Sequence, residues 1–352
     1  MTATSAVLPQ ARSTTTSANG DYRLPLLPPG EYTLTFSADG MASETRTAQV
    51  LLQSNTTVDA GMAPEAVVET VEVIGTTLID TTSTELKAAI GDQVIQSLPV
   101  GQEYRDLIKL IPGVQFTQDT VRGPSAGGSG QDNSYQFDGV NVTLPLFGTL
   151  SSQPSSHDID QISVVKGGAK AVDFNRSGGF SINSVSKSGT NRFRGQLSYQ
   201  VQPESTTADR DTQNASTFEE DKEWATLSAG GPIVRDRLFF YGSYFRPTSE
   251  KQNTQNAYGA VPNFESERDE FFGKLTFTPR ENFSLNASYR DSDRSNDTAS
   301  VGSRAAATTA LGEDGTLGIS ILEGSWIIND KSYASFKYTD FENQTSSIPD
   351  NL

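Results

Sequence analysis

From Arg192 to the end of the chain, polar and apolar residues alternate along short segments, the pattern of β-strands with two different faces. The alternation is clear in residues 193–201, 282–290 and 334–339, and slightly less clean in 271–277. Residues 223–229 form another candidate strand, while 238–245 and 319–328 are apolar on both faces and give no orientation. We therefore predict about seven strands of nearly membrane-spanning length.

The connections between these segments alternate strictly between long and short. Residues 203–222, 247–267 and 292–316 are long, polar stretches, whereas GPIVRDR, TPREN and NDK are short turns. Outer-membrane barrels have short periplasmic turns and long external loops, and a soluble sandwich has no such rhythm. Because the first connection is long, the first strand is expected to run outward, with the preceding residues on the periplasmic side.

The N-terminal stretch predicts a small β-domain. SANGDYRLPLLPPGEYTLTFSADG suggests two strands joined at Pro28–Gly30 and closed by Asp39–Gly40. Tyr32, Leu34 and Phe36 alternate with polar residues, as in a half-buried strand. Residues 45–52 and 56–62 suggest two more strands.

The middle of the chain predicts one helix among short strands and glycine-rich loops. Residues 103–111 have apolar side chains at helical spacing, and Pro112-Gly113 ends the helix; the apolar positions are Tyr104, Leu107, Ile108 and Ile111. GPSAGGSG, at 123–130, lacks the spacing of a phosphate-binding loop and is interpreted as a turning loop. We predict domains at 1–65, 66–191 and 192–352.

Composition narrows the possible partners and location. The 352 residues include 43 acidic and 27 basic residues, a net charge of −16 that argues against nucleic-acid binding. Cysteine is absent, which excludes disulfides and thiolate metal sites. No apolar run approaches the roughly 18 residues of a spanning helix. Met1–Gly20 has no signal-peptide pattern, so we expect the signal peptide to be missing from this chain.

The chemistry of an enzyme is not evident. His157, the single histidine, lies in the polar stretch SSQPSSHDID and is predicted to be solvated with Asp158. The acidic pairs Asp209/Asp211 and Glu219/Glu220 fall in predicted external loops. DSDRSND, from Asp291, lacks the glycine and closing glutamate of a calcium loop. We predict no catalytic residue, metal or cofactor.

Two resemblances follow from the motifs. NGDYRLPLLPPGEYTLTFSADG resembles the later part of the carboxypeptidase regulatory-like domain. QFDGVNV, ISVVKGGAKAVDFNRSGGFSINSVSKSGTN and GGPIVRDRLFFYGSYF resemble TonB-dependent outer-membrane transporters. Together they imply a mainly β chain truncated at both ends. Such a chain would consist of a partial transthyretin-like β-sandwich, an α+β plug domain and roughly the first seven antiparallel strands of a 22-stranded transmembrane β-barrel.

The transporter resemblance assigns a structural plug motif, in which glycines permit tight folding inside a barrel wall. Its residues here are Asp138, Gly139, Val140, Lys166, Gly167, Gly168, Gly178 and Gly179. The sequence VDFNRSGG departs from the family, which often has a small residue and a tyrosine or phenylalanine before the glycine pair.

The resemblance also implies an energy-coupling segment that binds the periplasmic domain of TonB. The candidate is VVETVEVIG, 67–75, an extended segment able to add a strand to a partner's sheet. The proposed TonB-binding residues are Glu69, Thr70, Val71, Glu72 and Val73. The alternative is that 71–74 forms the first plug strand.

The resulting expectation is a Gram-negative outer-membrane receptor, in contact with lipid, that takes up an unidentified small or polymeric ligand without covalent chemistry. The ligand would bind external loops and a plug apex that includes Leu144, Phe147 and Leu150. A surface carbohydrate-binding or adhesion protein, a secreted β-sandwich, and export in place of import remain alternatives.

Overall fold

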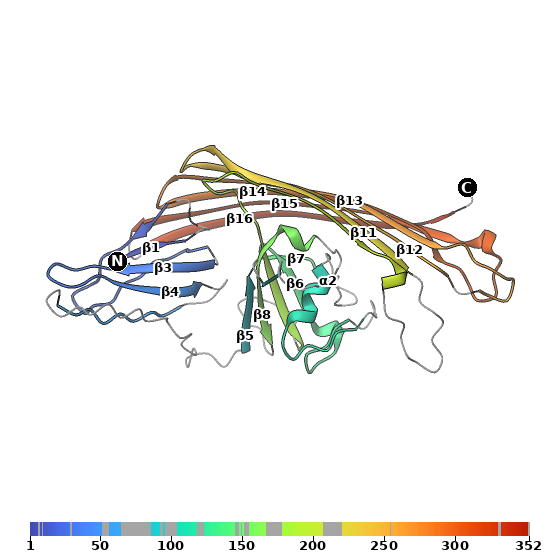
Figure 1. The fold of residues 1–352 in the computed structure, drawn as a ribbon, viewed down its shortest axis with the longest axis horizontal. Helices are drawn as coiled ribbons and strands as arrows, with labels where there is room; N and C mark the ends of the chain where they lie inside the picture. Colours follow the sequence, from blue (N-terminus) through green and yellow to red (C-terminus); the bar gives the residue numbers. More distant parts are fainter. Residues whose placement is uncertain are drawn as a thin grey trace.

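Three separate β-sheets organise the described part of the chain (Figure 1). The computed structural model describes residues 1–5, 8, 10–28, 30–50, 56–64, 86–91, 94–95, 104–117, 123–144, 148, 150, 155–166, 178–206, 220–253, 255–329 and 332–350. No helix among these residues is long and apolar enough to cross a membrane.

The N-terminal sheet has the strand order β2-β1-β3-β4. Its strands are β1 (Thr2–Thr4), β2 (Arg12–Ser13), β3 (Gly30–Phe36) and β4 (Glu44–Val50). The predicted strand around Tyr32 is confirmed, with Tyr32, Leu34 and Phe36 buried.

Two of the predicted N-terminal strands are wrong. Residues 21–28 form no strand, because Leu26 has a positive φ of 56° and the Pro25 carbonyl accepts a hydrogen bond from Arg12 Nη1 at 3.1 Å. Residues 56–62 form none either, although Val58 and Met62 pack against the core of the sheet. Both segments therefore contribute apolar cover without joining the sheet.

The second sheet, the plug sheet, has the order β5-β8-β9-β6-β7. Its strands are β5 (Leu86–Gly91), β6 (Ser134–Phe137), β7 (Val140–Asn141), β8 (Ile159–Lys166) and β9 (Phe180–Ser186). Strands β6 and β9 are parallel, and the other neighbours are antiparallel.

The predicted helix is present but short. It consists of α2 (Tyr104–Leu107) followed by the 3₁₀ turn η2 (Ile108–Leu110) before Pro112. All four of the apolar residues predicted to face the core are buried there: Tyr104, Leu107, Ile108 and Ile111. Two further 3₁₀ turns, η3 (Gly130–Asp132) and η4 (Ser156–Asp158), precede β6 and β8.

The third sheet, the wall, confirms the predicted seven strands. They run in sequence order, each antiparallel to the next: β10 (Arg194–Gln202), β11 (Glu220–Val234), β12 (Leu238–Lys251), β13 (Phe264–Arg280), β14 (Phe283–Ser300), β15 (Leu311–Asn329) and β16 (Ser332–Pro349). Short 3₁₀ turns, η6 (Glu204–Thr206) and η7 (Ala307–Thr309), lie in two of the long connections.

The predicted external loops begin too early in the sequence. Strands β12 and β13 pair as far as Lys251 with Phe264, and the stretch that begins at Asp291 lies within β14. These strands extend into polar sequence, because backbone hydrogen bonding between neighbouring strands does not depend on apolar side chains. The long connections shrink to 252–263 and 301–310, whereas 235–237 and 281–282 are short turns as predicted.

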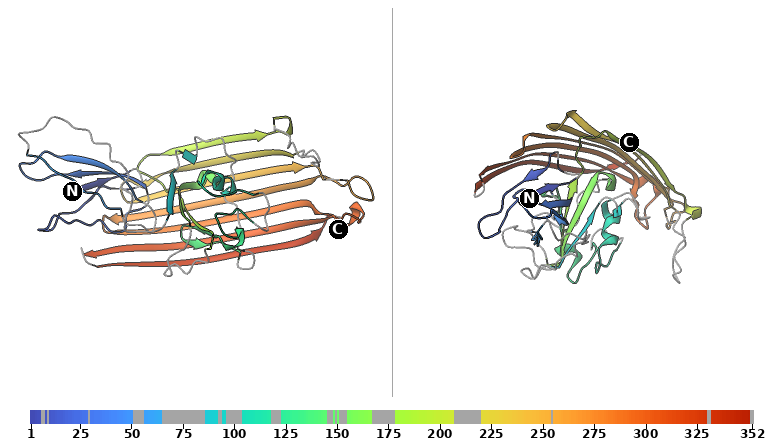
Figure 2. Two further views of the ribbon diagram at one scale, coloured as in Figure 1. Left: turned by 90° about the horizontal axis from the view of Figure 1, so that it is seen from below. Right: turned by 60° about the vertical axis from the view of Figure 1, so that its left-hand side comes forward.

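The wall curves over the plug sheet (Figure 2), so its two faces meet different surroundings. Leu317, Ile319 and Ile321 of β15 are buried in the same apolar cluster as the plug core, and Leu322 and Trp326 are exposed on the other side. The structure therefore orients the run 319–328, which the sequence left ambiguous.

Tyrosines mark a boundary on the outward face of the wall. Tyr199 OH donates to Glu223 Oε2 at 2.7 Å and Tyr289 OH donates to Asp291 Oδ1 at 3.1 Å, each toward the long connections. Apolar residues such as Leu275 occupy the surface on the other side of this boundary. Amphipathic rings at the edge of an apolar band are typical of the membrane–water interface.

Candidate functional site between plug and wall

The turn η4 carries the central acidic group of the site. Ser155 caps it, since its Oγ accepts from the His157 N–H at 3.2 Å. Asp158 is 1% exposed and His157 9% exposed, so the predicted solvation of this pair is wrong. Residues 155–158 are buried because they lie against polar side chains on the inner face of the wall.

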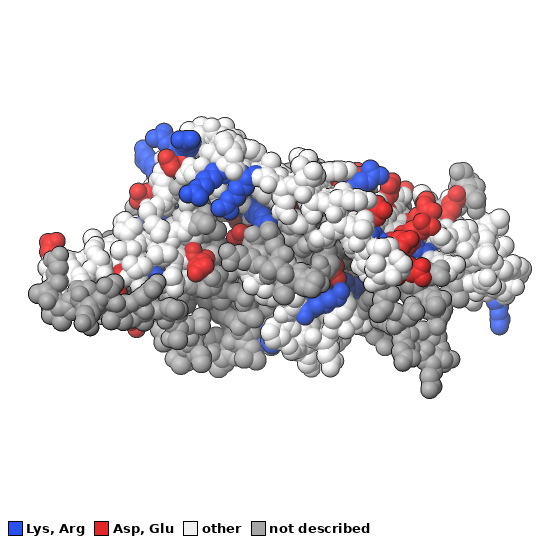
Figure 3. Space-filling model, viewed as in Figure 1, with Lys and Arg blue, Asp and Glu red and all other residues white. Residues whose placement is uncertain are grey.

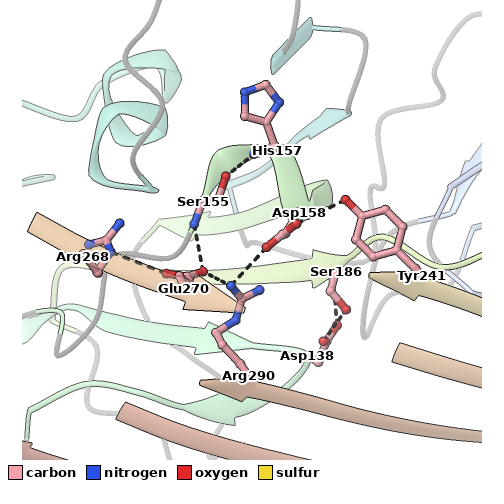
Figure 4. A network of polar contacts seen from close by, with 9 residues as sticks. All are labelled: Asp138, Ser155, His157, Asp158, Ser186, Tyr241, Arg268, Glu270 and Arg290. Atoms are coloured by element: carbon pink, nitrogen blue, oxygen red, sulfur yellow. Dashed lines mark hydrogen bonds and ion pairs between the residues drawn. The ribbon is translucent and has the colours of Figure 1, made fainter. Parts of the chain in front are cut away.

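Arg290 of β14 joins the plug to the wall (Figure 4). Its Nη1 donates to Asp158 Oδ2 at 3.2 Å and also pairs with Glu270 of β13. Its guanidinium carbon lies 4.4 Å from the centre of the Phe272 ring. Tyr241 OH of β12 donates to the other Asp158 oxygen at 3.2 Å. Three wall strands therefore converge on one plug turn.

Glu270 extends the same network. It is 2% exposed, accepts from the Ser155 N–H at 3.3 Å, and has Arg268 Nε 3.7 Å from its second oxygen. Two carboxylates thus face two guanidinium groups in a largely buried site. Buried ions of this kind are tolerated when opposite charges and hydrogen bonds satisfy them, and loss of one partner is strongly destabilising.

A second polar contact lies at the Asp138 turn. The Asp138 carboxylate accepts from the Ser186 N–H at 2.9 Å and from Ser186 Oγ at 2.6 Å. Lys274 of β13 donates to Ser186 Oγ at 3.0 Å, and Lys337 of β16 donates to the Asp138 carbonyl. The plug is therefore attached to the wall at two points.

Desolvation alone would raise the pKa of Asp138. The Lys274 ammonium, the two hydrogen bonds from Ser186 and the Lys337 ammonium outweigh it and lower the pKa below its ordinary value. Asp138 is therefore ionised at neutral pH and supplies a negative charge to this contact.

The backbone explains the residue types of the Asp138 turn. Asp138 and Gly139 have φ values of 45° and 75°, and Phe137 pairs with Val140 across them. Such a two-residue turn requires positive φ at both positions, which aspartate tolerates and glycine favours. The turn thereby directs Asp138 toward Ser186.

The glycine pair at 178–179 lies against the loop at 123–130. A Cβ on Gly128 would lie 2.7 Å from the Gly178 carbonyl oxygen, and a Cβ on Gly178 would lie 3.3 Å from Asp132 Cβ. The Phe180 N–H donates to Asn133 Oδ1 at 3.2 Å. Close backbone approach is therefore the physical role of these glycines. Lys166, at the end of β8, donates to the Pro112 carbonyl, while Gly167 and Gly168 lie outside the described residues.

A small cavity separates the two polar contacts. Its volume is about 20 Å³, and a polar site of that size is large enough for one water molecule. It is lined by Asp138, Asp158, Ser184, Ser186, Ser288 and Arg290 together with five apolar residues.

Most of the other predicted site residues lie outside the part of the chain that the structure describes. Glu69, Thr70, Val71, Glu72 and Val73 lie outside the described residues, as does Phe147. Leu150 packs against the plug core and Leu144 is half-buried, its carbonyl accepting from the Gly148 N–H at 2.8 Å.

Sequence reasoning missed the wall side of the site. Glu270 and Lys274 of β13 and Arg290 of β14 were not among the predicted site residues. A charged residue in the middle of a membrane-length strand is the signal that marks them, because such a charge needs a partner inside the barrel.

Comparison with known proteins agrees with this geometry. Residues 2–63 match the carboxypeptidase regulatory-like domain and residues 185–309 match an outer membrane beta barrel domain. In structure, the chain is similar to the outer membrane transporter YddB from Escherichia coli, with a TM-score of 0.57 and 17% identity over 72% of this chain and 38% of that one. The siderophore receptor PirA from Pseudomonas aeruginosa gives a TM-score of 0.51 with 16% identity, over 74% and 40% of the two chains.

A curved wall of antiparallel strands around an attached plug defines an outer-membrane β-barrel receptor. The chain is also 31% identical over 280 residues to the TonB-dependent transporter Oar of Myxococcus xanthus. That match covers 72% of this chain and 25% of the relative, so the chain spans about a quarter of its length. The chain is therefore similar in sequence to the TonB-dependent transporters, a family of outer-membrane proteins that are not enzymes, and shares the barrel-and-plug fold.

Proposed function

We propose that the receptor carrying this chain takes up a ligand across the outer membrane by energy coupled through TonB. The observation that carries the proposal is the pair of attachments between plug and wall, at Asp158 and Asp138. A plug held by a buried ion pair and by further hydrogen bonds closes a barrel at rest, and its opening requires work. An external source of energy is therefore part of the proposal.

The coupling segment is proposed at Glu69, Thr70, Val71, Glu72 and Val73, which precede β5 in the sequence. Strand β5 is at the edge of the plug sheet and pairs only with β8 among the described strands. A partner that binds the residues before β5 therefore acts on an edge strand. The identity of the ligand is left open, and Leu144, Phe147 and Leu150 are its proposed contacts. The domain boundaries after residues 65 and 191 stay a prediction.

The test is binding of the purified receptor to the periplasmic domain of TonB. Val71→Pro removes a backbone N–H that strand addition needs and is expected to weaken binding at least about tenfold. Val71→Ile keeps both the N–H and the β-branched side chain, and is the matched control. Cells with each variant are then assayed for ligand-dependent growth with and without a proton gradient. Equal binding by the proline variant and the wild type would contradict the proposed coupling segment.

A further inference from the structure

The charges on the wall are distributed unequally between its two ends. Figure 3 shows Lys and Arg gathered at the end near the N-terminal sheet, and Asp and Glu gathered toward the opposite end. The basic end includes four exposed arginines from three successive connections: Arg192, Arg235, Arg237 and Arg280.

These four arginines, which we call the arginine rim, are available for an external partner. Among the described residues, no ion pair or hydrogen bond joins any of their four guanidinium groups to another group. Of the two acidic residues beside them, Asp236 accepts from Asn191 Nδ2 at 2.8 Å, and no ion pair joins Glu281 to a rim arginine in the part of the chain that the structure describes.

The arginine rim is next to the apolar outward surface. Phe193 is 74% exposed beside Arg192, and Ile233 is 55% exposed beside Arg235. Neighbouring strands are about 5 Å apart, so the rim, from the start of β10 to the β13–β14 turn, extends over roughly 20 Å. Apolar side chains that end at a row of cations match the change from acyl chains to headgroups in a lipid leaflet.

We propose that the arginine rim binds the phosphate groups of anionic phospholipids in the periplasmic leaflet. Guanidinium groups suit this partner because they bind phosphate oxygens with two parallel hydrogen bonds. Basic residues at the end of a membrane-spanning segment are attracted to anionic headgroups. The inference depends on the wall lying in the membrane and is independent of the transported ligand.

The test measures lipid selectivity of the intact receptor in phosphatidylcholine vesicles. Spin-labelled phosphatidylglycerol and spin-labelled phosphatidylcholine report the motionally restricted lipid at the protein surface. The wild type is expected to prefer phosphatidylglycerol at least about threefold. The combined change Arg192→Gln, Arg235→Gln, Arg237→Gln and Arg280→Gln is expected to abolish that preference.

The matched control removes the same number of positive charges at the opposite end. It carries Lys222→Gln, Arg246→Gln, Lys251→Gln and Arg294→Gln, and three of these residues have carboxylate partners, Glu220, Glu267 and Glu313. This control variant is expected to keep the lipid preference. The wild type is also expected to keep its preference in excess glycerol phosphate, because the proposed partner is a headgroup in the membrane.

Two smaller variants keep the proposal testable if the fourfold variant does not fold. Arg235→Gln with Arg237→Gln, and Arg280→Gln alone, are each expected to lower the preference in part. The proposal is overturned if the wild type shows no preference for phosphatidylglycerol. It is also overturned if the rim and control variants lose this preference equally, which would indicate a dependence on net charge. Loss of preference to glycerol phosphate would identify a free phosphate site instead.

Discussion

Asn191 and Asp236 hold each other by two hydrogen bonds of 2.8 Å. Asn191 Nδ2 donates to Asp236 Oδ1, and the Asp236 N–H donates back to Asn191 Oδ1. Asp236 has a positive φ of 64° in the β11–β12 turn, while Asn191 lies in the link between plug and wall. The pair therefore fixes the C-terminal end of the plug to the first short turn of the wall.

Asn191→Ala is expected to lower the stability of this link by about 1 kcal/mol, because two exposed hydrogen bonds are lost to water. Hydrogen exchange at residues 187–193 measures the effect. Ser188→Ala, at an exposed position in the same link, is the control. Unchanged exchange in the Asn191 variant would contradict a fixed link.

Arg290→Met is expected to destabilise the plug by about 3–5 kcal/mol, since Asp158 and Glu270 then remain buried without their shared cation. Adding Asp158→Asn and Glu270→Gln is expected to recover part of the loss by removing the two charges. Urea unfolding of the plug measures the free energy of unfolding of both variants. The control Arg246→Met breaks an exposed pair with Glu267 and is expected to cost less than about 1 kcal/mol.

The Asp138 contact is expected to weaken in acid. Its pKa is lower in the folded receptor than in the unfolded chain, so the unfolded state takes up more protons as the pH falls. The stabilisation is complete above about pH 5 and is lost through about pH 4 and below. Unfolding measured from pH 6 to 3 is expected to be less pH-dependent in Asp138→Asn than in the wild type. Parallel curves for the two proteins would show that Asp138 does not contribute.

Gly128→Ala is expected to destabilise the plug, because the new Cβ would lie 2.7 Å from the Gly178 carbonyl oxygen and the backbone has to move. The expected loss is about 1–3 kcal/mol, as for other overpacked sites. Gly91→Ala is the control, since no atom lies within 4 Å of a Cβ at that position. Thermal unfolding of both variants provides the comparison.

Leu275→Arg is expected to impair insertion into membranes, because Leu275 is 47% exposed on the outward face of β13. A lipid-facing arginine costs about 2–4 kcal/mol near the bilayer midplane. Asn286→Arg is the matched control, because Asn286 faces inward and donates to Glu323 at 3.3 Å. The two variants are compared by folding them into vesicles and measuring the folded fraction from the altered gel mobility of folded barrels. Equal folded fractions would argue against a lipid-facing Leu275.

The wall could be predicted from sequence because each strand has a period of two and each turn has its own residue types. The same reasoning failed where backbone chemistry prevented regular pairing. Residues 21–28 have an alternating pattern, but the positive φ of Leu26 and the contact with Arg12 keep them out of the sheet. Strand ends were also misplaced, because Asp291 and its polar neighbours still pair with β15.

Of the residues at this site, sequence reasoning singled out only the Asp138 turn, as a structural motif, and expected Asp158 to be solvated. The Asp138-Gly139 turn has a recognisable local signature, whereas the partner of Asp158 is Arg290, 132 residues away. Alternation identifies the face of a strand but not its register against another domain. For the same reason, the burial of His157 could not be recognised from a stretch rich in serine.

The wall supplies four cations to the two contact sites, Arg268, Lys274, Arg290 and Lys337, and one carboxylate, Glu270. The two remaining negative charges, Asp158 and Asp138, come from the plug. A barrel emptied of its plug would therefore present an electropositive patch on this part of its inner face. Ions passing through such a pore would be selected by sign, and chloride would carry more of the current than potassium.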